Sequence, residues 1–315
     1  MSVLICGSIA FDTIMNFDGR FADQLLPDQL HNINVSFVVP GLRRDFGGCA
    51  GNIAYALRQL GGAPLPMVTV GVDGADYLAR LKSLGISAEF VREVSGMMTA
   101  QALIMTDTGN NQITAFHPGV MTQVHINTVT ARDDIRLGII SPDGREAMQQ
   151  PARQFKAAGI PFVFDPGQML PAFDGAELLQ FIELADWVAI NNYEAHMLCE
   201  RTGLALPDLS RRVRALAVTL GGEGCDIWEG GQSQRVAPTA ASQIADPTGC
   251  SDTWRGTLLY GLEQGWPVAR CAALGNRLGA IKIASHGPQN YQVQKEALLA
   301  GIYYEIGRAS CRERV

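Results

Sequence analysis

The sequence predicts an α/β fold with three layers, in which a mostly parallel central sheet lies between two layers of helices. From residue 63 onward, short apolar runs alternate with longer amphipathic segments, as strands and helices do when they take turns along a chain. Polar or glycine residues follow several of these apolar runs, which is typical of strand ends that bind a ligand. A further set of alternating segments has no helices between its members. We therefore also expect a small separate β-sheet that closes over a site as a lid.

The composition excludes several classes of partner. The chain has 315 residues, 47% of them hydrophobic, and a net charge of −6, so it can bury a large core in one or two domains. No basic block or aromatic–basic interleaving is present, and no apolar run approaches the roughly 18 residues that span a bilayer. We therefore expect neither nucleic acid nor a membrane as a partner.

The first residues and the cysteines predict a cytoplasmic protein. The segment from Met1 to Gly7 lacks the basic start and long apolar run of a signal peptide. The seven cysteines are scattered and form no CxxC pair, so we expect reduced thiols. The five histidines also lack metal-ligand spacing, and no structural zinc site is expected.

The N-terminal part predicts a strand followed by a glycine-rich turn. Residues 3–9 form an apolar run typical of a buried strand, and the segment ends near Asp12, where we expect the strand edge to open into a loop. Gly47 and Gly48 precede a helix expected over 52–60, and glycines in this place allow a ligand to approach the backbone closely. Each feature also fits a simpler interpretation, namely a turn-capping aspartate and a tight strand-to-helix turn.

The lid strands are expected in two stretches, within about 12–46 and 90–120. Residues 33–39 alternate partly between apolar and polar side chains, as a half-exposed strand does. Residues 100–106 and 112–116 alternate too, and the turn-forming residues between them predict a hairpin.

The rest of the chain supplies the central sheet and its helices. The expected strands lie near 67–70, 136–140, 161–165, 187–190 and 215–219. The expected helices lie near 74–84, 145–157, 176–184 and 192–201. A hairpin and three helices follow, near 225–237, 250–264, 268–284 and 292–300. Three strand ends carry residues suited to a ligand, in the segments Asp165–Gly167, Asn191–Glu194 and Thr219–Gly224. Gly222 and Gly224 also fit ordinary turns.

The stretch from Asp246 to Asp252 joins a loop of small residues to the helix expected over 250–264. Backbone N–H groups around Gly249 can turn toward one point, and the helix adds the positive end of its dipole. Asp252 stands beside this anion cradle. An acid that accepts a hydroxyl proton, next to a cradle for developing negative charge, suits phosphoryl transfer to a hydroxyl. Taken alone, the stretch fits an ordinary loop and helix cap equally well.

Motifs of several other enzyme classes are absent. The sequence contains no GxxxxGK[ST] P-loop, no GxGxxG followed by a suitable acid, no GxSxG and no HExxH. Phosphate binding would then depend on backbone amides and arginines. The candidates are Arg43, Arg44 and Arg255, and Arg255 is the best placed because it lies one turn after Asp252.

Five motifs, in order along the chain, resemble those of the ribokinase-like carbohydrate kinases, the PfkB family. They are Asp12 after the first strand, Gly47-Gly48…Asn52 before a helix ending in Leu60-Gly61, Asn191…Glu194, Thr219…Gly221…Gly224, and Asp246-Pro-Thr-Gly-Cys-Ser-Asp252. The resemblance covers essentially residues 1–300 and implies a ribokinase-like three-layer α/β/α fold with a β-sheet lid. Each motif is weak alone, and the five together in this order are specific.

The resemblance implies a role for each matching residue. Asp252 would be the catalytic base, and the amides of Gly249, Cys250 and Ser251 would hold the transferring phosphoryl group. The ATP site would include Thr219, Gly221, Gly224 and Gly287, while Asn191 and Glu194 would arrange Mg²⁺ and phosphates through water. The acceptor would be held by Asp12, Gly47, Gly48, Asn52 and the lid aromatic Phe116, although Phe116 also fits simple packing within the lid.

The resemblance also ranks the substrates that we expect to accept the phosphoryl group. The segments Phe46–Ala54 and His286–Asn290 look like those of bacterial members described as adenosine kinases. Adenosine is therefore the first expected acceptor, and ribose, fructose or a related sugar is the second. The resemblance allows a monovalent cation besides ATP and Mg²⁺. The lid strands allow either a monomer or a homodimer in which two lids pair.

Ser251 departs from the family pattern, which has a glycine immediately before the acid. Serine keeps its N–H but does not freely adopt a positive φ, and its Cβ would crowd the transferring phosphoryl group. Loss of one anion-hole donor costs about 10²- to 10³-fold in rate. A nucleoside- or sugar-binding protein with impaired catalysis is therefore the third expectation.

The last residues, 305–315, break the pattern before them and resemble a translated sequencing adapter. We expect this tail to be non-native and the kinase domain to comprise residues 1–304.

Overall fold

A large sheet forms the framework of the molecule. The computed structural model describes residues 1–25, 34–109, 111–123 and 127–300, whose strands form one sheet of nine and one of four. The strands of the large sheet are β1 (Ser2–Cys6), β4 (Pro64–Val70), β5 (Val91–Glu93), β8 (Ile135–Ile140), β9 (Phe162–Phe164), β10 (Trp187–Asn191), β11 (Ala215–Thr219), β12 (Cys225–Glu229) and β13 (Gln232–Val236). Their order in space is β13-β12-β11-β10-β9-β8-β1-β4-β5. Neighbours from β5 to β11 are parallel, so their carboxyl ends meet at one end of the sheet, while β12 and β13 add an antiparallel hairpin.

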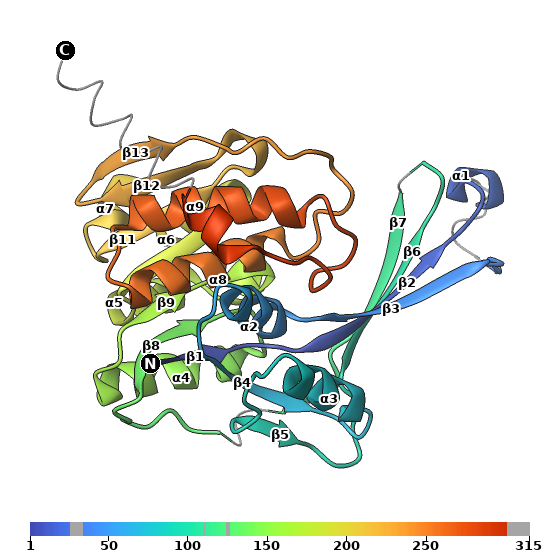
Figure 1. Cartoon of the computed structure of the whole chain (residues 1–315), viewed down its shortest axis with the longest axis horizontal. Helices are drawn as coiled ribbons and strands as arrows, with labels where there is room; N and C mark the ends of the chain where they lie inside the picture. Colours follow the sequence, from blue (N-terminus) through green and yellow to red (C-terminus); the bar gives the residue numbers. More distant parts are fainter. Residues whose placement is uncertain (26–33, 110, 124–126, 301–315) are drawn as a thin grey trace.

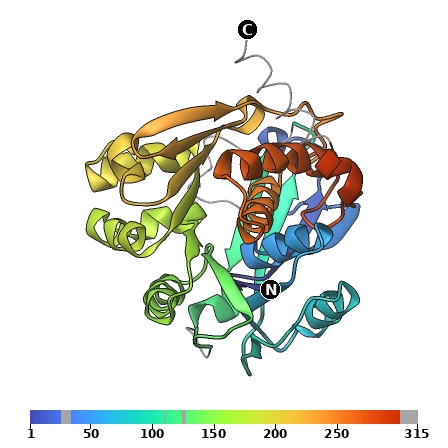
Figure 2. The ribbon, with the colours of Figure 1, turned by 60° about the vertical axis from the view of Figure 1, so that its left-hand side comes forward.

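Helices cover both faces of this sheet (Figures 1 and 2). One layer contains α2 (Cys49–Gln59), α3 (Ala75–Ser83), α8 (Cys250–Glu263) and α9 (Val268–Lys282). The other contains α4 (Arg145–Ala158), α5 (Gly175–Leu184), α6 (Asn192–Thr202) and α7 (Leu206–Ser210). Alternate residues of a strand face opposite ways, so Val3 and Ile5 of β1 join the first core and Leu4 and Cys6 join the second.

The other elements of the described residues are short. They are α1 (Phe21–Gln24), the 3₁₀ turns η2 (Gly119–Thr122), η3 (Gly167–Ala172) and η4 (Gly221–Glu223), and a helical segment at 295–300.

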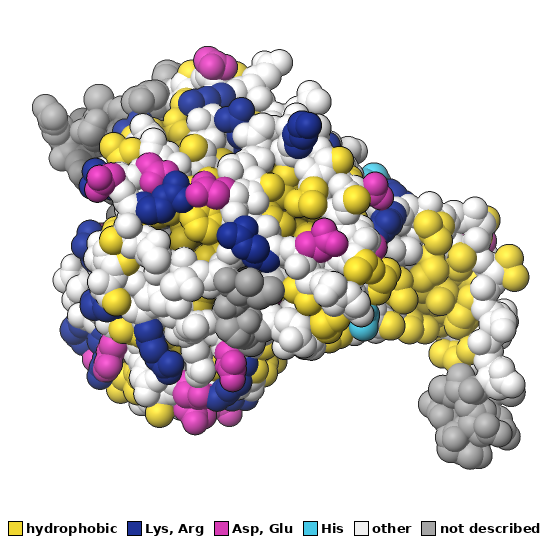
Figure 3. Space-filling view, turned by 90° about the horizontal axis from the view of Figure 1, so that it is seen from below, with side chains coloured by type: hydrophobic (Ala, Val, Ile, Leu, Met, Phe, Trp, Pro, Cys, Tyr) yellow, Lys and Arg dark blue, Asp and Glu magenta, His cyan; other side chains and the backbone are white. Residues whose placement is uncertain are grey.

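The small sheet projects from the body as a long arm (Figure 1). It contains, in spatial order, β3 (Gly41–Gly47), β2 (Ala10–Asn16), β6 (Ala100–Thr106) and β7 (Gln112–His117). The register places Asp12 opposite Ala102, and Ala102 opposite Phe116. Side chains of residues directly opposite each other share a face, so Asp12 and Phe116 point to the same side of the lid. Figure 3 shows apolar side chains gathered over this arm.

The structure confirms the predicted three layers and the separate small sheet, with two corrections near the N-terminus. The apolar run at 3–9 is not one strand, because β1 ends at Cys6 and β2 begins at Ala10. Asp12 therefore lies inside a lid strand and not at the end of the first strand. Residues 34–39 form no strand, and the lid strand begins at Gly41. Pro40 lacks a backbone donor for strand pairing. The segment instead packs through Phe37, whose ring centre lies 5.0 Å from that of Phe17 and 5.3 Å from that of Phe21.

Among the described residues, no helix has the length and apolar character needed to cross a membrane. The predicted tail at 305–315 lies outside the described residues, as does residue 33 of the predicted lid strand.

Candidate active site

The loop before α8 has a fixed shape. Gly249 has a φ of 77°, and a Cβ at this position would lie 2.6 Å from the Cβ of Pro288, so only glycine fits. The carboxylate of Asp246 accepts the amide hydrogen of Thr248 at 2.9 Å and that of Gly287 at 2.8 Å. The loop is thereby joined to the turn that follows α9.

A buried lysine completes this anchoring. Lys282, the last residue of α9, has no exposed surface, and its ammonium donates to the carbonyl oxygens of Asp246 (2.7 Å) and Ser285 (3.2 Å). Burial lowers the pKa of Lys282, and the nearby Cys250 and Asp246 oppose this effect. The C-terminal end of a helix also favours a cation. Lys282 therefore holds the loop by its charge from inside the protein.

The first backbone amides of α8 make up part of the predicted anion cradle. The N–H of Cys250 donates to the carbonyl of Pro247 at 3.1 Å, so this predicted donor is already engaged. The N–H groups of Gly249, Ser251 and Asp252 make no hydrogen bond within the part of the chain that the structure describes. These groups point the positive end of the α8 dipole at any anion bound there.

Ser251 does not have the strained backbone that its sequence position suggested. It lies in the first turn of α8, where the backbone is right-handed, and the left-handed position belongs to Gly249. Its side chain is exposed. The expectation that a serine here meets a positive φ is therefore wrong.

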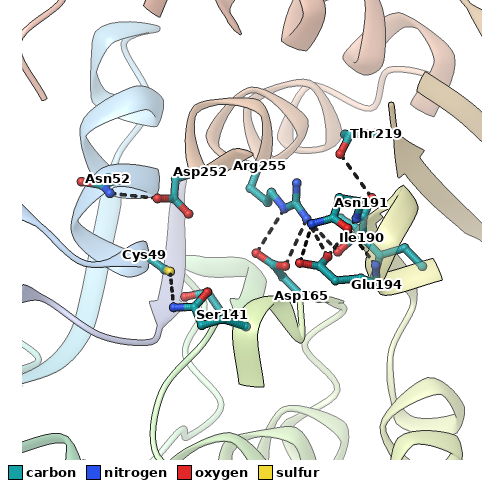
Figure 4. Close-up of polar contacts among 12 residues, drawn as sticks. Cys49, Asn52, Ser141, Asp165, Ile190, Asn191, Glu194, Thr219, Asp252 and Arg255 are labelled. Carbon is teal, nitrogen blue, oxygen red and sulfur yellow. Dashed lines mark hydrogen bonds and ion pairs between the residues drawn. The ribbon is translucent and has the colours of Figure 1, made fainter. Parts of the chain in front are cut away.

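Asp252 lies beside α2 in the first turn of α8 (Figure 4). The Nδ2 of Asn52 donates to its Oδ2 at 2.8 Å. Burial raises the pKa of Asp252 to about 6, the hydrogen bond from Asn52 opposes this shift, and the charge of Asp165 adds to it. A carboxyl group with this pKa is ionised at neutral pH and remains basic enough to accept a proton in a transition state.

Asp12 approaches the same region from the root of the lid. Burial raises the pKa of Asp12 to about 6, and the charges of Asp45 and Asp252 contribute to the shift. Gly47 leaves room for this carboxylate, since a Cβ at position 47 would lie 2.3 Å from the Oδ2 of Asp12. One carboxylate from the lid and one from α8 thus lie close enough to repel each other.

A buried arginine joins α8 to the opposite layer (Figure 4). Arg255 is 2% exposed; its Nε and Nη2 donate to the two carboxylate oxygens of Asp165, at 3.1 and 3.2 Å. Nη2 also donates to the carbonyl of Ala189 at 3.2 Å and lies 3.8 Å from Oε2 of Glu194. Burial raises the pKa of Asp165 and of Glu194, and Arg255 opposes both shifts. Arg255 is therefore held mainly by protein carboxylates, while its Nη1 is buried without a hydrogen-bond partner among the described residues.

The other two candidate arginines, Arg43 and Arg44, each form an ion pair with an aspartate at the root of the lid. The Nε of Arg43 donates to Asp45 at 2.7 Å, and Arg44 lies 3.5 Å from Asp73 with its guanidinium 3.6 Å from the ring centre of Phe11. Both arginines contribute to the structure of the lid root.

Asn191 and Glu194 form the N-terminal cap of α6. The Nδ2 and backbone N–H of Asn191 each donate to a carboxylate oxygen of Glu194 at 2.8 Å, and the Oδ1 of Asn191 accepts from the Glu194 amide at 2.8 Å. Thr219, at the end of β11, is the strand neighbour of Asn191. The predicted residues thus meet at the carboxyl ends of two adjacent strands.

The donor set here suits Mg²⁺ bound mainly by phosphates and water. Across the described ranges, no group of three or more His, Cys, Asp and Glu side chains is placed to hold a metal. Mg²⁺ commonly takes only one or two protein carboxylates besides water and substrate phosphates. Glu194 is such a carboxylate, with lone pairs remaining on oxygens that each accept one hydrogen bond.

A cavity of about 490 Å³ brings several of these residues together. Four predicted site residues line it: Asn191, Glu194, Ser251 and Asp252. Its walls also include Asp165, Arg255, Gln168 and Cys49. The predicted nucleotide residues Thr219, Gly221, Gly224 and Gly287 and the predicted acceptor residues Asp12, Gly47, Gly48, Asn52 and Phe116 are not among its lining residues.

The sequence predicts Asp165 at a strand end suited to a ligand and Arg255 as a phosphate contact, but it does not predict that the two residues pair. Asp165 follows an apolar strand, as ligand-binding residues often do, but its partner Arg255 is 90 residues away and no spacing connects them.

Two predicted glycines have a structural reason that is independent of any ligand. Gly48 has a φ of 83°, and a Cβ there would lie 2.4 Å from the Cα of Ile9. Gly224 has a φ of 88°, and its Cβ would lie 2.2 Å from the carbonyl oxygen of Val236. In both places the backbone approach excludes any other residue.

Several known proteins are similar to this chain in fold, and two of them also in sequence. The nucleoside kinase of Burkholderia thailandensis, solved in complex with inosine, is 47% identical, with coverage of 97% of this chain and 98% of that one and a TM-score of 0.86. The nucleoside kinase of Methanocaldococcus jannaschii is 29% identical over 92% of this chain and 93% of its own length, and its structure has a TM-score of 0.87. The adenosine kinase of Sinorhizobium meliloti, 22% identical over 95% of this chain and 99% of that one with a TM-score of 0.78, shares the fold.

The family model for pfkB family carbohydrate kinases matches residues 13–295. That range contains lid strands β3, β6 and β7, β2 from residue 13 onward, the α6 cap and the α8 loop with Asp252. The ribokinase-like architecture that the motifs implied is confirmed by the structural neighbours. The chain therefore belongs to the pfkB family of carbohydrate kinases and is a phosphotransferase of the nucleoside and sugar kinase type.

Proposed function

We propose that this enzyme is an ATP-dependent nucleoside kinase, with purine nucleosides such as adenosine and inosine as acceptors. One geometric observation carries the chemistry: Asp252, with a pKa of about 6, lies among free amides at the start of α8 and beside a cavity that contains Asn191 and Glu194. The choice of a nucleoside is supported by the relative with 47% identity, a nucleoside kinase solved with inosine.

Asp252 acts as the general base in this proposal. An acceptor hydroxyl donates its proton to the carboxylate as the hydroxyl oxygen attacks the γ-phosphorus of ATP, and the bond to the β–γ bridging oxygen breaks to release ADP. The amides of Gly249 and Ser251 and the α8 dipole stabilise negative charge on the transferring group. The role predicted for the Cys250 amide is the weakest of the three, because that N–H already has a partner.

The nucleotide lies along the carboxyl ends of the strands in this proposal. Thr219, Gly221, Gly224 and Gly287 line its binding region, and Asn191 and Glu194 hold Mg²⁺ through water. Mg²⁺ neutralises phosphate charge when it is bound. Because Arg255 compensates the charges of Asp165 and Glu194, the phosphates meet less uncompensated negative charge at this end of the sheet.

The positions of Asp12 and Phe116 on one face of the lid suit a nucleoside better than a single sugar ring. The two residues are separated by one intervening strand, which places them about 10 Å apart. Asp12 can accept hydrogen bonds from ribose hydroxyls, and Phe116, which is 53% exposed, offers an aromatic face for a base. Gly47, Gly48 and Asn52 complete the acceptor side of the site.

A coupled assay of ADP release tests the proposal. Adenosine, inosine, ribose and fructose are compared at equal concentration, with Asp252→Asn as the catalytic control. We expect turnover with the nucleosides, little with free sugars, and a loss of several orders of magnitude in the variant. Turnover with ribose or fructose alone would make the enzyme a sugar kinase. Calorimetric binding of a nucleoside without ADP release would make the chain a binding protein with impaired catalysis.

A further inference from the structure

A chain of buried hydrogen bonds connects the lid to Asp252. The hydroxyl of Tyr77, on α3, donates to the carbonyl oxygen of Gly47, the last residue of lid strand β3, at 2.6 Å. The side-chain amide of Gln289 donates to the Oη of Tyr77 and to the Oδ1 of Asn52, each at 3.0 Å. The Nδ2 of Asn52 donates to Asp252 at 2.8 Å. Four segments that are far apart in the sequence thus meet in one network.

We infer that Gln289 and Tyr77 are positioning residues for phosphoryl transfer, which hold the side-chain amide of Asn52 so that its N–H faces Asp252. This inference rests on the proposed role of Asp252 as the base.

The direction of every bond follows from the lid end of the network. The backbone carbonyl of Gly47 can only accept, so Tyr77 uses its single hydroxyl hydrogen there. The oxygen of Tyr77 must then accept from Gln289, which turns the NH₂ of Gln289 toward Tyr77 and Asn52. The Oδ1 of Asn52 accepts the second hydrogen of that NH₂, which leaves its Nδ2 for Asp252. If the side-chain amide of Asn52 were turned by 180°, its Nδ2 would face the Nε2 donor of Gln289, and its Oδ1 would face the Oδ2 acceptor of Asp252.

The surrounding protein shields the side chains of the network from solvent. Tyr77 has no exposed surface, Gln289 is 2% exposed and Asn52 is 4% exposed. Burial raises the pKa of Tyr77, so its hydroxyl stays protonated and remains a donor. Arg80 fixes the backbone of Gln289 by donating to its carbonyl at 2.7 Å.

Gly51 provides the space for the network. A Cβ at this position in α2 would lie 2.0 Å from the Oη of Tyr77 and 3.2 Å from the Nε2 of Gln289. Glycine is unfavourable inside a helix, so its place here needs a reason. The close approach of the Tyr77 hydroxyl supplies that reason.

The two ends of the network predict different kinetic signatures. A hydrogen bond donated by Asn52 favours the ionised form of Asp252, so its loss raises the pKa of the base. The bond from Tyr77 fixes the carbonyl of Gly47, a proposed acceptor-binding residue, so its loss weakens acceptor binding. A side chain that served only stability would change neither the pH profile nor the balance of KM between the two substrates.

The experiment compares pH–rate profiles of Gln289→Met and Tyr77→Phe with wild type. Gln289→Met removes both N–H donors of the side-chain amide and keeps the side chain at nearly the same size. We expect the acidic limb of the pH profile of kcat to move up by about 0.5 to 1 pH unit. Activity at pH 6 should then fall about two- to fivefold while activity near pH 8.5 stays within about twofold. Tyr77→Phe keeps the bond from Gln289 to Asn52, so it should mainly raise the KM for the nucleoside and leave the KM for ATP unchanged.

Gln292→Met is the matched control, because it makes the same chemical change at an exposed position of the same loop. It should leave the profile unchanged. Gln289→Glu is a second variant that can only accept from Asn52, and it should move the acidic limb further upward. Thermal unfolding identifies the variants that are folded.

The Asp252→Asn variant distinguishes a failure of the proposed function from a failure of the positioning role. Normal turnover in that variant would remove the base, and the proposed function would fail with it. An inactive Asp252→Asn beside a wild-type acidic limb in a folded Gln289→Met or Gln289→Glu variant would overturn the positioning role alone.

Discussion

Two carboxyl groups at the site have a pKa well above that of an ordinary aspartate. Burial raises the pKa of Asp252 and of Asp12 to about 6, and the proximity of other carboxylates adds to both shifts. Each group is ionised at neutral pH, yet each holds a proton more readily than a surface carboxylate does. In a phosphoryl-transfer site, this property belongs to a group that must receive a proton during the reaction.

The pH dependence of kcat/KM for the nucleoside should report both groups. Protonation of Asp252 removes the proton acceptor, and protonation of Asp12 removes an acceptor for substrate hydroxyls, so activity falls as the pH drops below about 6. The slope of the logarithmic plot should approach two in wild type and one in Asp12→Asn. Initial rates between about pH 5 and pH 9 measure this, and a profile that stays flat down to pH 5 would contradict the assignment.

Ser251→Gly tests the departure from the family pattern. Because Ser251 already has a helical backbone and an exposed side chain, we expect turnover to change by less than about twofold. The free energy of unfolding should fall by about 0.5 kcal/mol or less, since glycine is a poorer helix former than serine. Steady-state kinetics and urea unfolding measure both quantities. A tenfold rise in turnover would instead show that the serine Cβ obstructs the phosphoryl group.

At the scale of elements, helix ends and strand ends supply the charges that hold the site together. Arg255 extends from α8 across the ends of β9 and β10 to Glu194 of α6, and so connects the two helix layers. Lys282 extends from the end of α9 to the loop that begins α8. The loop therefore depends on cations from within the chain for its shape.

Lys282→Ala should weaken this loop. Two backbone carbonyls would lose their buried donor, at a cost of about 1–3 kcal/mol each in the free energy of unfolding. Displacement of the cradle amides should lower kcat about 10- to 100-fold. Ammonium or methylammonium, which fits the space left by the side chain, should restore part of the rate, whereas tetramethylammonium should not.

Lys156→Ala, at an exposed position of α4, is the control for Lys282→Ala and should behave as wild type in every salt. If ammonium stimulates both variants equally, the stimulation is not specific to the position of Lys282. The assignment of the Lys282 ammonium as the group that holds the loop would then be wrong.

At the scale of the whole molecule, the arm-like lid and the body each contribute one wall of the site that we propose. The lid provides Asp12 and Phe116 from one face of its sheet, and the body provides Asp252 and the strand ends. Closing the lid over the body would exclude water, which competes with the acceptor hydroxyl for the phosphoryl group.

Phe116→Ala tests whether the lid holds a base. Loss of base stacking on an aromatic ring costs about 1–3 kcal/mol, so the KM for the nucleoside should rise about 5- to 150-fold. The KM for ATP should stay unchanged, and so should thermal stability, because the ring is 53% exposed. Equal effects on both substrates would indicate that Phe116 packs within the lid and does not touch the acceptor.

The order of strands and helices could be predicted because each is a local pattern in the sequence. The hairpin of β6 and β7, the alternation from β8 to β11 and the start of α8 follow directly from periodicity and turn residues. The predictions failed where local patterns were ambiguous. The run at 3–9 continues its apolar character through a break that only tertiary structure creates between β1 and β2.

The inner part of the site could not be predicted for a related reason. Tyr77 and Gln289 are separated by 212 positions, and Arg255 and Asp165 by 90. No spacing rule connects such residues, because their contacts exist only after the sheet has brought strand ends and loops together. The five motifs identified the residues of the proposed reaction centre, and the side chains that we propose to orient them became visible only in three dimensions.

The order β3-β2-β6-β7 leaves the lid with two outer strands of different chemistry. β3 carries Arg43 and Arg44 and follows Pro40, and charges and proline discourage pairing with another chain. β7 has an exposed side chain at every position and contains no Lys, Arg, Asp or Glu. Within the described residues, its outer edge has no strand partner. We therefore expect aggregation of the concentrated enzyme to begin at the six residues of β7.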